Sequence, residues 1–306
     1  MARKEGRGPP ESAASPWGGG IMVQVIAIRG KRRLDMQRGK ALSVCIAGAT
    51  GWAGRAIAQG VLEAADLTLA AAVSRSAAGQ DLGQVLGRDA IGVPVYGAVS
   101  EALDEVDVLI DYTSPTAVKA NTLTAIDAGV AVVIGASGLT GPDYAEIDHA
   151  ARGRSVGVIA SGNFSLTAAM CQAGALLAAR HLPRWEVLDY ASADKPDVPS
   201  GTARDLAERL GEVRAPAVGY PIKDLHGPQE ARGATIAGTQ VHSIRLPSFV
   251  VSTEVIFGLH DERLTIRHDA GGTPEPYVAG TLIAARRVPE LVGLTRGLDR
   301  LLIDGE

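Results

Sequence analysis

The sequence predicts an α/β protein with two parts: a parallel sheet covered by helices, then an α+β part with an antiparallel or mixed sheet. Three observations predict this. The chain has 306 residues, of which 46% are hydrophobic, enough for roughly two domains with sizeable cores. Aromatic residues make up only 4%, while Ala, Val, Leu and Gly are abundant, which suits buried parallel strands under closely packed helices. Short apolar runs alternate with helical patterns from Leu42 to Ala160, and strand-like segments dominate after Ser161.

Residues 1–40 differ in charge from the rest of the chain. They hold nine Lys/Arg against three Asp/Glu, a net of +6, so residues 41–306 carry 21 minus 31, or −10. A basic segment can bind nucleic acid or membrane. Its Pro- and Gly-rich stretches instead favour a disordered extension, and Met22 or Met36 is an alternative start. We therefore expect neither a nucleic-acid nor a membrane partner.

Two further features set the expected compartment. The sequence has no run of about 18 apolar residues, so it predicts no transmembrane segment. Cys45 and Cys171 are the only cysteines, and without a secretory signal both are interpreted as reduced, buried, small hydrophobic residues. We expect a cytoplasmic protein.

The elements follow in order along the chain. Strands of the first part are expected at Ser43–Ala47, Leu67–Val73, Val93–Val95, Val108–Asp111, Val130–Ile134 and Val156–Ala160, with helices that begin near Gly54, Ser100, Ala117 and Asp143. In the second part we expect a helix from Leu166 to about Arg180, another at Ala203–Leu210, strands at Trp185–Tyr190, Gly233–Leu246, Phe249–Gly258 and Glu262–His268, and a final helix at Pro276–Val288.

The link between the first strand and first helix is the most informative stretch. An apolar run leads into Gly48, Gly51 and Gly54, followed by the helical run from Arg55 to Ala64. Glycines let the backbone turn tightly and approach a pyrophosphate, and free N–H groups at the helix start attract phosphates. The pattern predicts a dinucleotide-binding (Rossmann) domain, although glycines after a strand also occur in α/β proteins that bind no cofactor.

The end of the second strand bears on the choice of nicotinamide cofactor. NAD sites usually place an Asp or Glu there for the ribose 2′-hydroxyl, whereas a 2′-phosphate needs hydroxyl and cationic groups. This chain has Ser74, Arg75 and Ser76 and no carboxylate. The stretch favours NADPH, because the planar guanidinium of Arg75 suits a phosphate. The alternative is a solvated loop arginine.

Further segments resemble one known family. Asp111-Tyr112-Thr113, Gly135-Ala136-Ser137-Gly138 and Gly162-Asn163-Phe164-Ser165 are similar to the D-F-T, G-T-T-G and P-N-F-S segments of dihydrodipicolinate reductases. Lys195 followed by Pro199-Ser200-Gly201-Thr202-Ala203 is similar to that family's substrate loop. Strand segments such as Glu254–Gly258 and Leu264–Asp269 follow in the family's order, and the resemblance covers about residues 42 to 304.

The resemblance implies a domain organisation and a set of site residues. It implies a dinucleotide-binding domain at 41–163, a substrate-binding and oligomerisation domain at 164–275, a C-terminal helix at 276–306 that returns to the first domain, and a homotetramer. The cofactor-binding residues are then expected to be Gly48, Thr50, Gly51, Trp52, Ala53, Ser74, Arg75, Ser76, Tyr112, Thr113, Gly135, Ser137, Ser161, Asn163 and Phe164.

The substrate side combines agreement with departure. Ser200, Gly201 and Thr202 precede a helix and are expected to hold a substrate carboxylate, with an ordinary helix cap as the alternative. The family's H-H-x-H-K loop, whose first histidine is its proposed proton donor, corresponds here to Ala191-Ser192-Ala193-Asp194-Lys195. Alanine cannot transfer a proton. Only Lys195 is kept, and Asp194 adds a negative charge that suits a cationic imine or is simply exposed to solvent.

Departures gather around the substrate, while the cofactor loops are largely retained. Ser252-Thr253 stands where relatives have His-Gln, and Gly271–Pro274 stands where they have an arginine. We therefore expect an NADPH-dependent imine reductase with altered specificity, in which Lys195 and Asp194 are the catalytic candidates and Ala191, Ser200, Gly201 and Thr202 line the substrate site. The alternatives are a true 4-hydroxy-tetrahydrodipicolinate reductase and a catalytically silent NADPH-binding protein. No metal site is expected.

Overall fold

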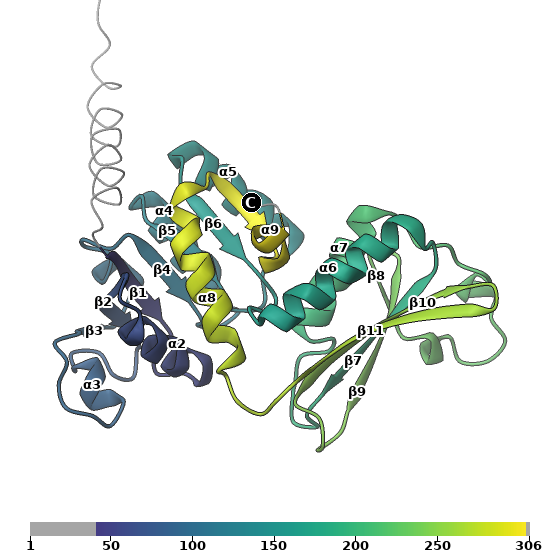
Figure 1. Ribbon diagram of the computed structural model, residues 1–306, viewed down its shortest axis with the longest axis horizontal. Coiled ribbons are helices and arrows are strands. Elements are labelled where there is room, and N and C mark those ends of the chain that lie inside the picture. Colours follow the sequence, from purple (N-terminus) through teal and green to yellow (C-terminus); the bar gives the residue numbers. More distant parts are fainter. Residues whose placement is uncertain (1–40, 304–306) are drawn as a thin grey trace, which may run out of the picture. The chain divides into compact units, whose positions relative to one another are not determined.

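The computed structural model describes residues 41–303, which form two sheets with their covering helices (Figure 1). The expected disordered extension at 1–40 lies outside the described residues, as do the last three residues. No helix in the described part is long and apolar enough to cross a membrane.

The first sheet has seven strands in the order β12-β6-β5-β4-β1-β2-β3, and every pair in it is parallel. Its strands are β1 (Leu42–Ala47), β2 (Leu67–Val73), β3 (Val95–Tyr96), β4 (Val108–Asp111), β5 (Ala131–Ile134), β6 (Gly157–Ala160) and β12 (Gly293–Arg296). Every residue of β4, β5 and β6 is buried, as expected for a parallel sheet with helices on both faces.

Alternate residues of β1 supply the two cores. Val44 and Ile46 belong to the cluster that includes residues of α2 (Trp52–Glu63) and α8 (Pro276–Arg287). Cys45 and Ala47 belong to the cluster under α4 (Val118–Asp127) and α5 (Gly141–Arg154). Burial raises the pKa of Cys45 to about 12 and that of Cys171 to about 11, and both thiols are free. These cysteines therefore have the packing role that the sequence predicts.

Local signals define the helices of this part. Thr140 and Asp143 form a capping box that starts α5. A short helix, α3 (Leu82–Val85), follows Asp81, whose side chain accepts a hydrogen bond from Gly83 N–H. α2 and α8 pack closely at Gly60, where a Cβ would lie only 2.3 Å from Val278 Cγ1.

The second sheet is mixed. Its order is β11-β10-β7-β9-β8, from β7 (Trp185–Ala191), β8 (Ala234–Ile236), β9 (Thr239–Arg245), β10 (Val251–Leu259) and β11 (Glu262–Ala270). Only the β7–β9 pair is parallel. α6 (Leu166–His181) and α7 (Gly201–Val213) supply the residues that cover it, including Leu206 and Leu210 beside Trp185.

The structure corrects the single strand expected at Gly233–Leu246. The segment forms a hairpin, in which Ala237 (φ 46°) and Gly238 (φ 83°) make the turn between β8 and β9. Two positive φ values are typical of a tight hairpin turn, for which Asn-Gly is the usual sequence signal. Because alanine rather than asparagine stands at the first turn position, the sequence carries no such signal here.

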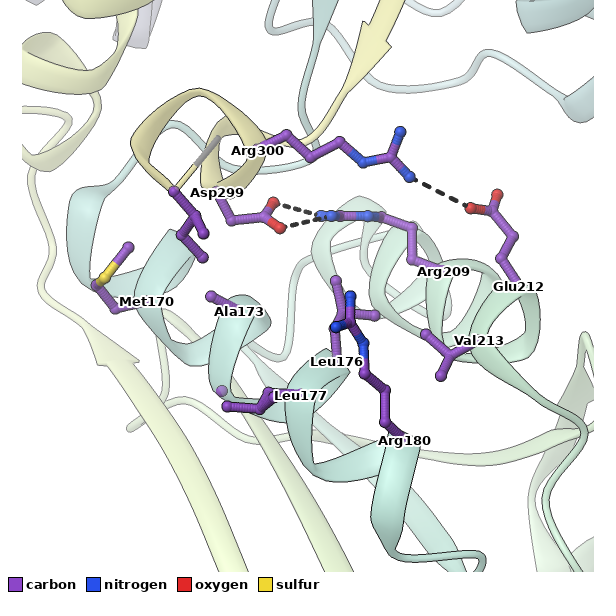
Figure 2. A pocket seen from close by; sticks show the side chains of 12 residues that line it. Met170, Ala173, Leu176, Leu177, Arg180, Arg209, Glu212, Val213, Asp299 and Arg300 are labelled. Carbon is purple, nitrogen blue, oxygen red and sulfur yellow. Dashed lines mark hydrogen bonds and ion pairs between the residues drawn. The ribbon is translucent and has the colours of Figure 1, made fainter. Parts of the chain in front are cut away.

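Two arginines join α7 to the C-terminal segment that contains β12 and α9 (Leu298–Ile303). Arg209 and Asp299 form a buried two-point contact, with both Nη–Oδ distances 2.6 Å, which Figure 2 shows. Arg296 Nη2 lies 2.8 Å from both Asp205 Oδ1 and Glu208 Oε2, and its guanidinium stacks on the Tyr144 ring at 4.3 Å. Since Arg296 belongs to β12, these contacts tie α7 to the first sheet.

We predict that Arg209→Met destabilises the protein by about 3–5 kcal/mol, because Asp299 would remain buried without its partner. The double variant Arg209→Met/Asp299→Leu should be less destabilised than the single one. Arg154→Ala is the control, since its pair with Asp127 is largely exposed and should contribute at most about 1 kcal/mol. Urea unfolding measures all three. A loss for Arg209→Met as small as the control's would contradict this prediction.

Candidate active site

The glycine loop after β1 permits two close backbone approaches. Gly48 has φ +84°, and a Cβ there would lie 2.5 Å from the Tyr112 carbonyl oxygen. A Cβ on Gly54 would lie 2.0 Å from the Gly48 carbonyl oxygen. Gly51 caps α2 without a capping side chain, so the helix start stays open to an anion. The loop therefore has the geometry that a pyrophosphate needs.

The loop after β2 carries a cluster of hydroxyls. Thr50 Oγ1 and Ser74 Oγ are 2.9 Å apart, and Ser74 Oγ lies 3.3 Å from Ser76 Oγ. Arg75 is exposed, and its side chain has no hydrogen bond or ion pair within residues 41–303. Arg75 thus lies between two of three clustered hydroxyl residues in the sequence, and its guanidinium has no partner among residues 41–303; this donor set suits a phosphate.

The loops after β4 and β5 meet through Tyr112. Its ring lies over Gly135, where a Cβ would be 2.1 Å from Tyr112 Cζ. The Tyr112 hydroxyl lies 2.8 Å from Thr281 Oγ1 on α8, and burial raises the pKa of the phenol. The Thr113 hydroxyl donates to Asp111 Oδ1 at 2.6 Å. Since both side chains are used internally, these two residues would meet a cofactor mainly through backbone groups.

Asn163, after β6, leaves one donor unpaired. Its Oδ1 accepts a hydrogen bond from Ser165 N–H at 2.8 Å, and its carbonyl accepts one from the Ser161 hydroxyl at 2.7 Å. Asn163 Nδ2 is buried and has no partner in the described part of the chain. Buried amide donors are nearly always paired, so this orphan is available for a ligand.

Three other predicted cofactor residues lie in distinct environments. Trp52 is 55% exposed and meets the Tyr277 ring edge-on, with centroids 5.8 Å apart. Ala53 packs at the margin of the first core. Phe164 is buried, 6.2 Å from the Tyr112 ring between centroids. Of these three, Trp52 offers the most open surface.

A cleft of about 140 Å³ lies where the loops after β4, β5 and β6 meet α7. Gly135, Ser137, Ser161 and Gly201 line it, so the structure brings three predicted cofactor residues and one predicted substrate residue together. A Cβ on Gly201 would lie 3.3 Å from Ser137 Cβ. No histidine is among the residues that line this cleft.

At the start of α7, backbone N–H groups are free while the hydroxyls are not. Ser200 Oγ accepts a hydrogen bond from Ala203 N–H at 3.3 Å, so Ser200 is the helix cap that the sequence leaves as an alternative. The Thr202 hydroxyl donates to the Gly162 carbonyl at 3.1 Å. The N–H groups of Gly201 and Thr202 have no partner among residues 41–303. These two groups are the donors left for an anion.

The residues proposed for catalysis do not line the cleft. Lys195 Nζ lies 2.8 Å from Asp197 Oδ1, and it is Asp197 that lines the cleft. Asp194 is exposed and has no ion-pair partner in the described residues. Ala191 is fully buried at the end of β7. In this structure Ala191 therefore offers no surface to a substrate, contrary to the role that we expected for it.

The cleft also contains charged residues that the sequence analysis missed: Asp197, Arg204, Asp205, Glu208 and Arg296. Arg204 is exposed, and its side chain has no partner within the described chain. Its position in the first turn of α7 after Gly201 was an available signal. No such signal marks Arg296 in the sequence, because only the pairing of β12 with β6 brings this residue to the cleft. Burial raises the pKa of Asp205, although the positive charges of Arg209 and Arg296 act to lower it.

A larger hollow of about 640 Å³ lies elsewhere, among α6, α7 and α9 (Figure 2). Its lining includes the apolar residues Met170, Leu177 and Ile303 and the basic residues Arg180 and Arg300. None of the predicted site residues lines it. We therefore assign the chemistry to the smaller cleft.

Comparison with known proteins gives consistent matches along the chain. Residues 42–164 match the family described as dihydrodipicolinate reductase, N-terminus, and residues 164–300 match its C-terminus. A 4-hydroxy-tetrahydrodipicolinate reductase of Desulfitobacterium hafniense is 35% identical, over 86% of this chain and 99% of the relative. One from Moorella thermoacetica is 36% identical, over 85% and 98%.

A solved structure agrees with these relatives. A dipicolinate-bound dihydrodipicolinate reductase from Paenisporosarcina sp. TG-14 has a TM-score of 0.67 and 28% identity, and the match covers 85% of this chain and 99% of that one. An amine dehydrogenase from Mycobacterium smegmatis, with a TM-score of 0.59 and 16% identity, shares the fold.

Proposed function

The chain belongs to the dihydrodipicolinate reductase family and is an NAD(P)H-dependent oxidoreductase of that type, and we propose that it uses NADPH to reduce a C=N bond in a substrate other than the family's cyclic dicarboxylate. One observation carries the proposal. No histidine lines the cleft, and Ala191, which by sequence resemblance corresponds to the family's proposed proton donor, is fully buried.

The residues present fit a dinucleotide. The glycine loop would hold its pyrophosphate, and Asn163, whose Nδ2 has no partner among the described residues, lies in the loop that leads to the cleft. Arg75 and the Thr50–Ser74–Ser76 hydroxyls would hold a 2′-phosphate, which supports NADPH over NADH. When bound, NADPH supplies the hydride, and the protein contributes orientation and electrostatics.

The charges in the cleft support a changed substrate. Asp197 pairs with Lys195, while Asp205 and Glu208 pair with Arg296. Arg204 and Gly201 line the cleft, so the Arg204 side chain and the free N–H groups at the start of α7 remain for one anionic group. An imine that is protonated in solution already carries an electrophilic iminium, so it needs less help from an enzyme acid. On this proposal the negative charge of Asp194, on the segment between β7 and α7, would favour such a cation.

A second candidate function is a true 4-hydroxy-tetrahydrodipicolinate reductase that uses water or Lys195 as the acid. Identity of 35–36% over nearly the full length of relatives with that activity in their names favours it. The missing acid alone favours a third candidate, a silent NADPH-binding protein. Turnover measurements separate the three.

We predict a homotetramer assembled through the second sheet. β8 and β11 are its edges, and the exposed β11 residues include Leu264, 44% exposed, so an unpartnered edge would favour association. Light scattering at micromolar concentration should give four times the 31.6 kDa chain mass. A monomer mass would rule the prediction out.

We predict that Arg75→Ala weakens NADPH binding by about 1–3 kcal/mol, the range for a charge-assisted hydrogen bond, and leaves NADH binding nearly unchanged. Arg88→Ala, at another exposed arginine, is the control and should change neither affinity. Fluorescence titration of both cofactors measures this. Equal losses for NADPH and NADH would count against the phosphate site.

We predict slow turnover of the lysine-pathway dicarboxylate and faster NADPH oxidation with at least one other cyclic imine. Ala191→His alone should not restore strong lysine-pathway activity, because Ser252, Thr253 and Thr273 also depart from the family. A kcat/KM of about 10⁴ M⁻¹s⁻¹ or more for the dicarboxylate with the unaltered protein would favour the second candidate. Tight NADPH binding without turnover of any imine would favour the silent protein.

A further inference from the structure

Asp189 is a fully buried carboxylate in the middle of β7, and three donors meet one of its oxygens. Oδ2 accepts hydrogen bonds from Ser200 N–H at 2.9 Å, Ser243 Oγ at 2.9 Å and Arg245 Nη2 at 2.8 Å. We propose that Asp189 is a positioning residue that fixes the start of α7, where Gly201 lines the cleft, and so keeps the free N–H groups of Gly201 and Thr202 in place for an anion. This inference rests on the proposed function, since it concerns how that site binds an anion.

The contact with Ser200 acts directly on the start of α7. Ser200 precedes the two free N–H groups, and its own N–H is the one that Asp189 holds. Its side chain caps Ala203 in turn. The residue before the donors is therefore fixed at both its backbone and its side chain, which sets the direction of the next peptide groups.

Arg245 extends the same restraint along the loop. Its Nη2 lies 2.8 Å from Asp189 Oδ2 and 2.8 Å from the Asp197 carbonyl oxygen. The Asp197 side chain lies 2.8 Å from Lys195 Nζ. A single buried charge on Asp189 thus holds the loop at Ser200 directly and at Asp197 through Arg245.

The charge on Asp189 is maintained despite its burial. Burial favours the neutral acid, but the hydrogen bonds from Ser200, Arg245 and Ser243 outweigh it and lower the pKa of this carboxyl. A neutral amide would accept these bonds more weakly and leave Arg245, only 15% exposed at its side chain, without its counter-charge. The loop would then lose both restraints while the strand itself keeps its shape.

Full-length Asp189→Asn tests this. Pyridine-2-carboxylate is titrated by calorimetry into the NADPH-saturated protein, and NADPH is titrated separately. We expect the carboxylate to bind about 10- to 100-fold more weakly, as for a lost hydrogen bond to a charged group, with NADPH affinity unchanged within about twofold. Unchanged carboxylate affinity, an equal loss of NADPH affinity, or no carboxylate binding by the unaltered protein would overturn the proposal.

Two variants separate positioning from general damage. Glu186→Gln makes the same acid-to-amide change on the same strand, where Glu186 pairs with Arg232 and His242, and it should leave the carboxylate affinity unchanged. Arg245→Lys keeps the charge, but a single ammonium reproduces the fork of Arg245 poorly, so it should weaken carboxylate binding as Asp189→Asn does. If Asp189→Asn does not fold, the Arg245→Lys result decides. An Arg245→Lys protein that binds the carboxylate normally would contradict the proposal.

This experiment is independent of turnover. If no imine is reduced but Asp189→Asn still loses the carboxylate selectively, the positioning role stands and the proposed reaction fails. If imines are reduced and the variant binds the carboxylate normally, the reaction stands and the positioning role fails.

Discussion

The attachment of α7 to the C-terminal segment is the constraint on which the candidate site depends. α7 covers the second sheet and carries the free N–H groups, while the loops for a dinucleotide belong to the first sheet. The buried Arg209–Asp299 pair and the contacts of Arg296 with Asp205 and Glu208 join them. Breaking a buried ion pair is costly, so this attachment resists displacement. Residues of α7 and of the loops after β4, β5 and β6 therefore line one cleft.

Much of the fold follows from local pattern. β2 and β4 begin and end where their apolar runs predict, because strands that are mostly or fully buried leave a clear signal. β12 was missed because it is a short edge strand with Thr295 and Arg296, and only its pairing with β6 makes it a strand. The β8–β9 turn was missed because Ala237 adopts a positive φ that alanine rarely takes. For β12 a distant contact, rather than local preference, determines the structure.

The candidate site was less predictable than the fold. The glycine loop could be anticipated, since its spacing reflects backbone approach alone. The sequence could not show which polar groups are already hydrogen-bonded within the protein. The Ser200 and Thr202 hydroxyls form such bonds, and the Tyr112 hydroxyl pairs with that of Thr281, which lies 169 residues further along the chain. Arg296 and Asp189 were not identified because neither belongs to a recognisable motif. Family resemblance located the loops, whereas the structure showed which of their atoms remain free.

We propose that the cofactor half of the site is retained while the substrate half has changed to hold one carboxylate. The most direct measurement compares dipicolinate with pyridine-2-carboxylate as ligands of the unaltered, NADPH-saturated protein. We expect affinities within about threefold of each other, because the cleft offers one set of free donors and a second carboxylate gains little. Dipicolinate binding tighter by about tenfold or more would show that both carboxylates are recognised and would contradict the claim.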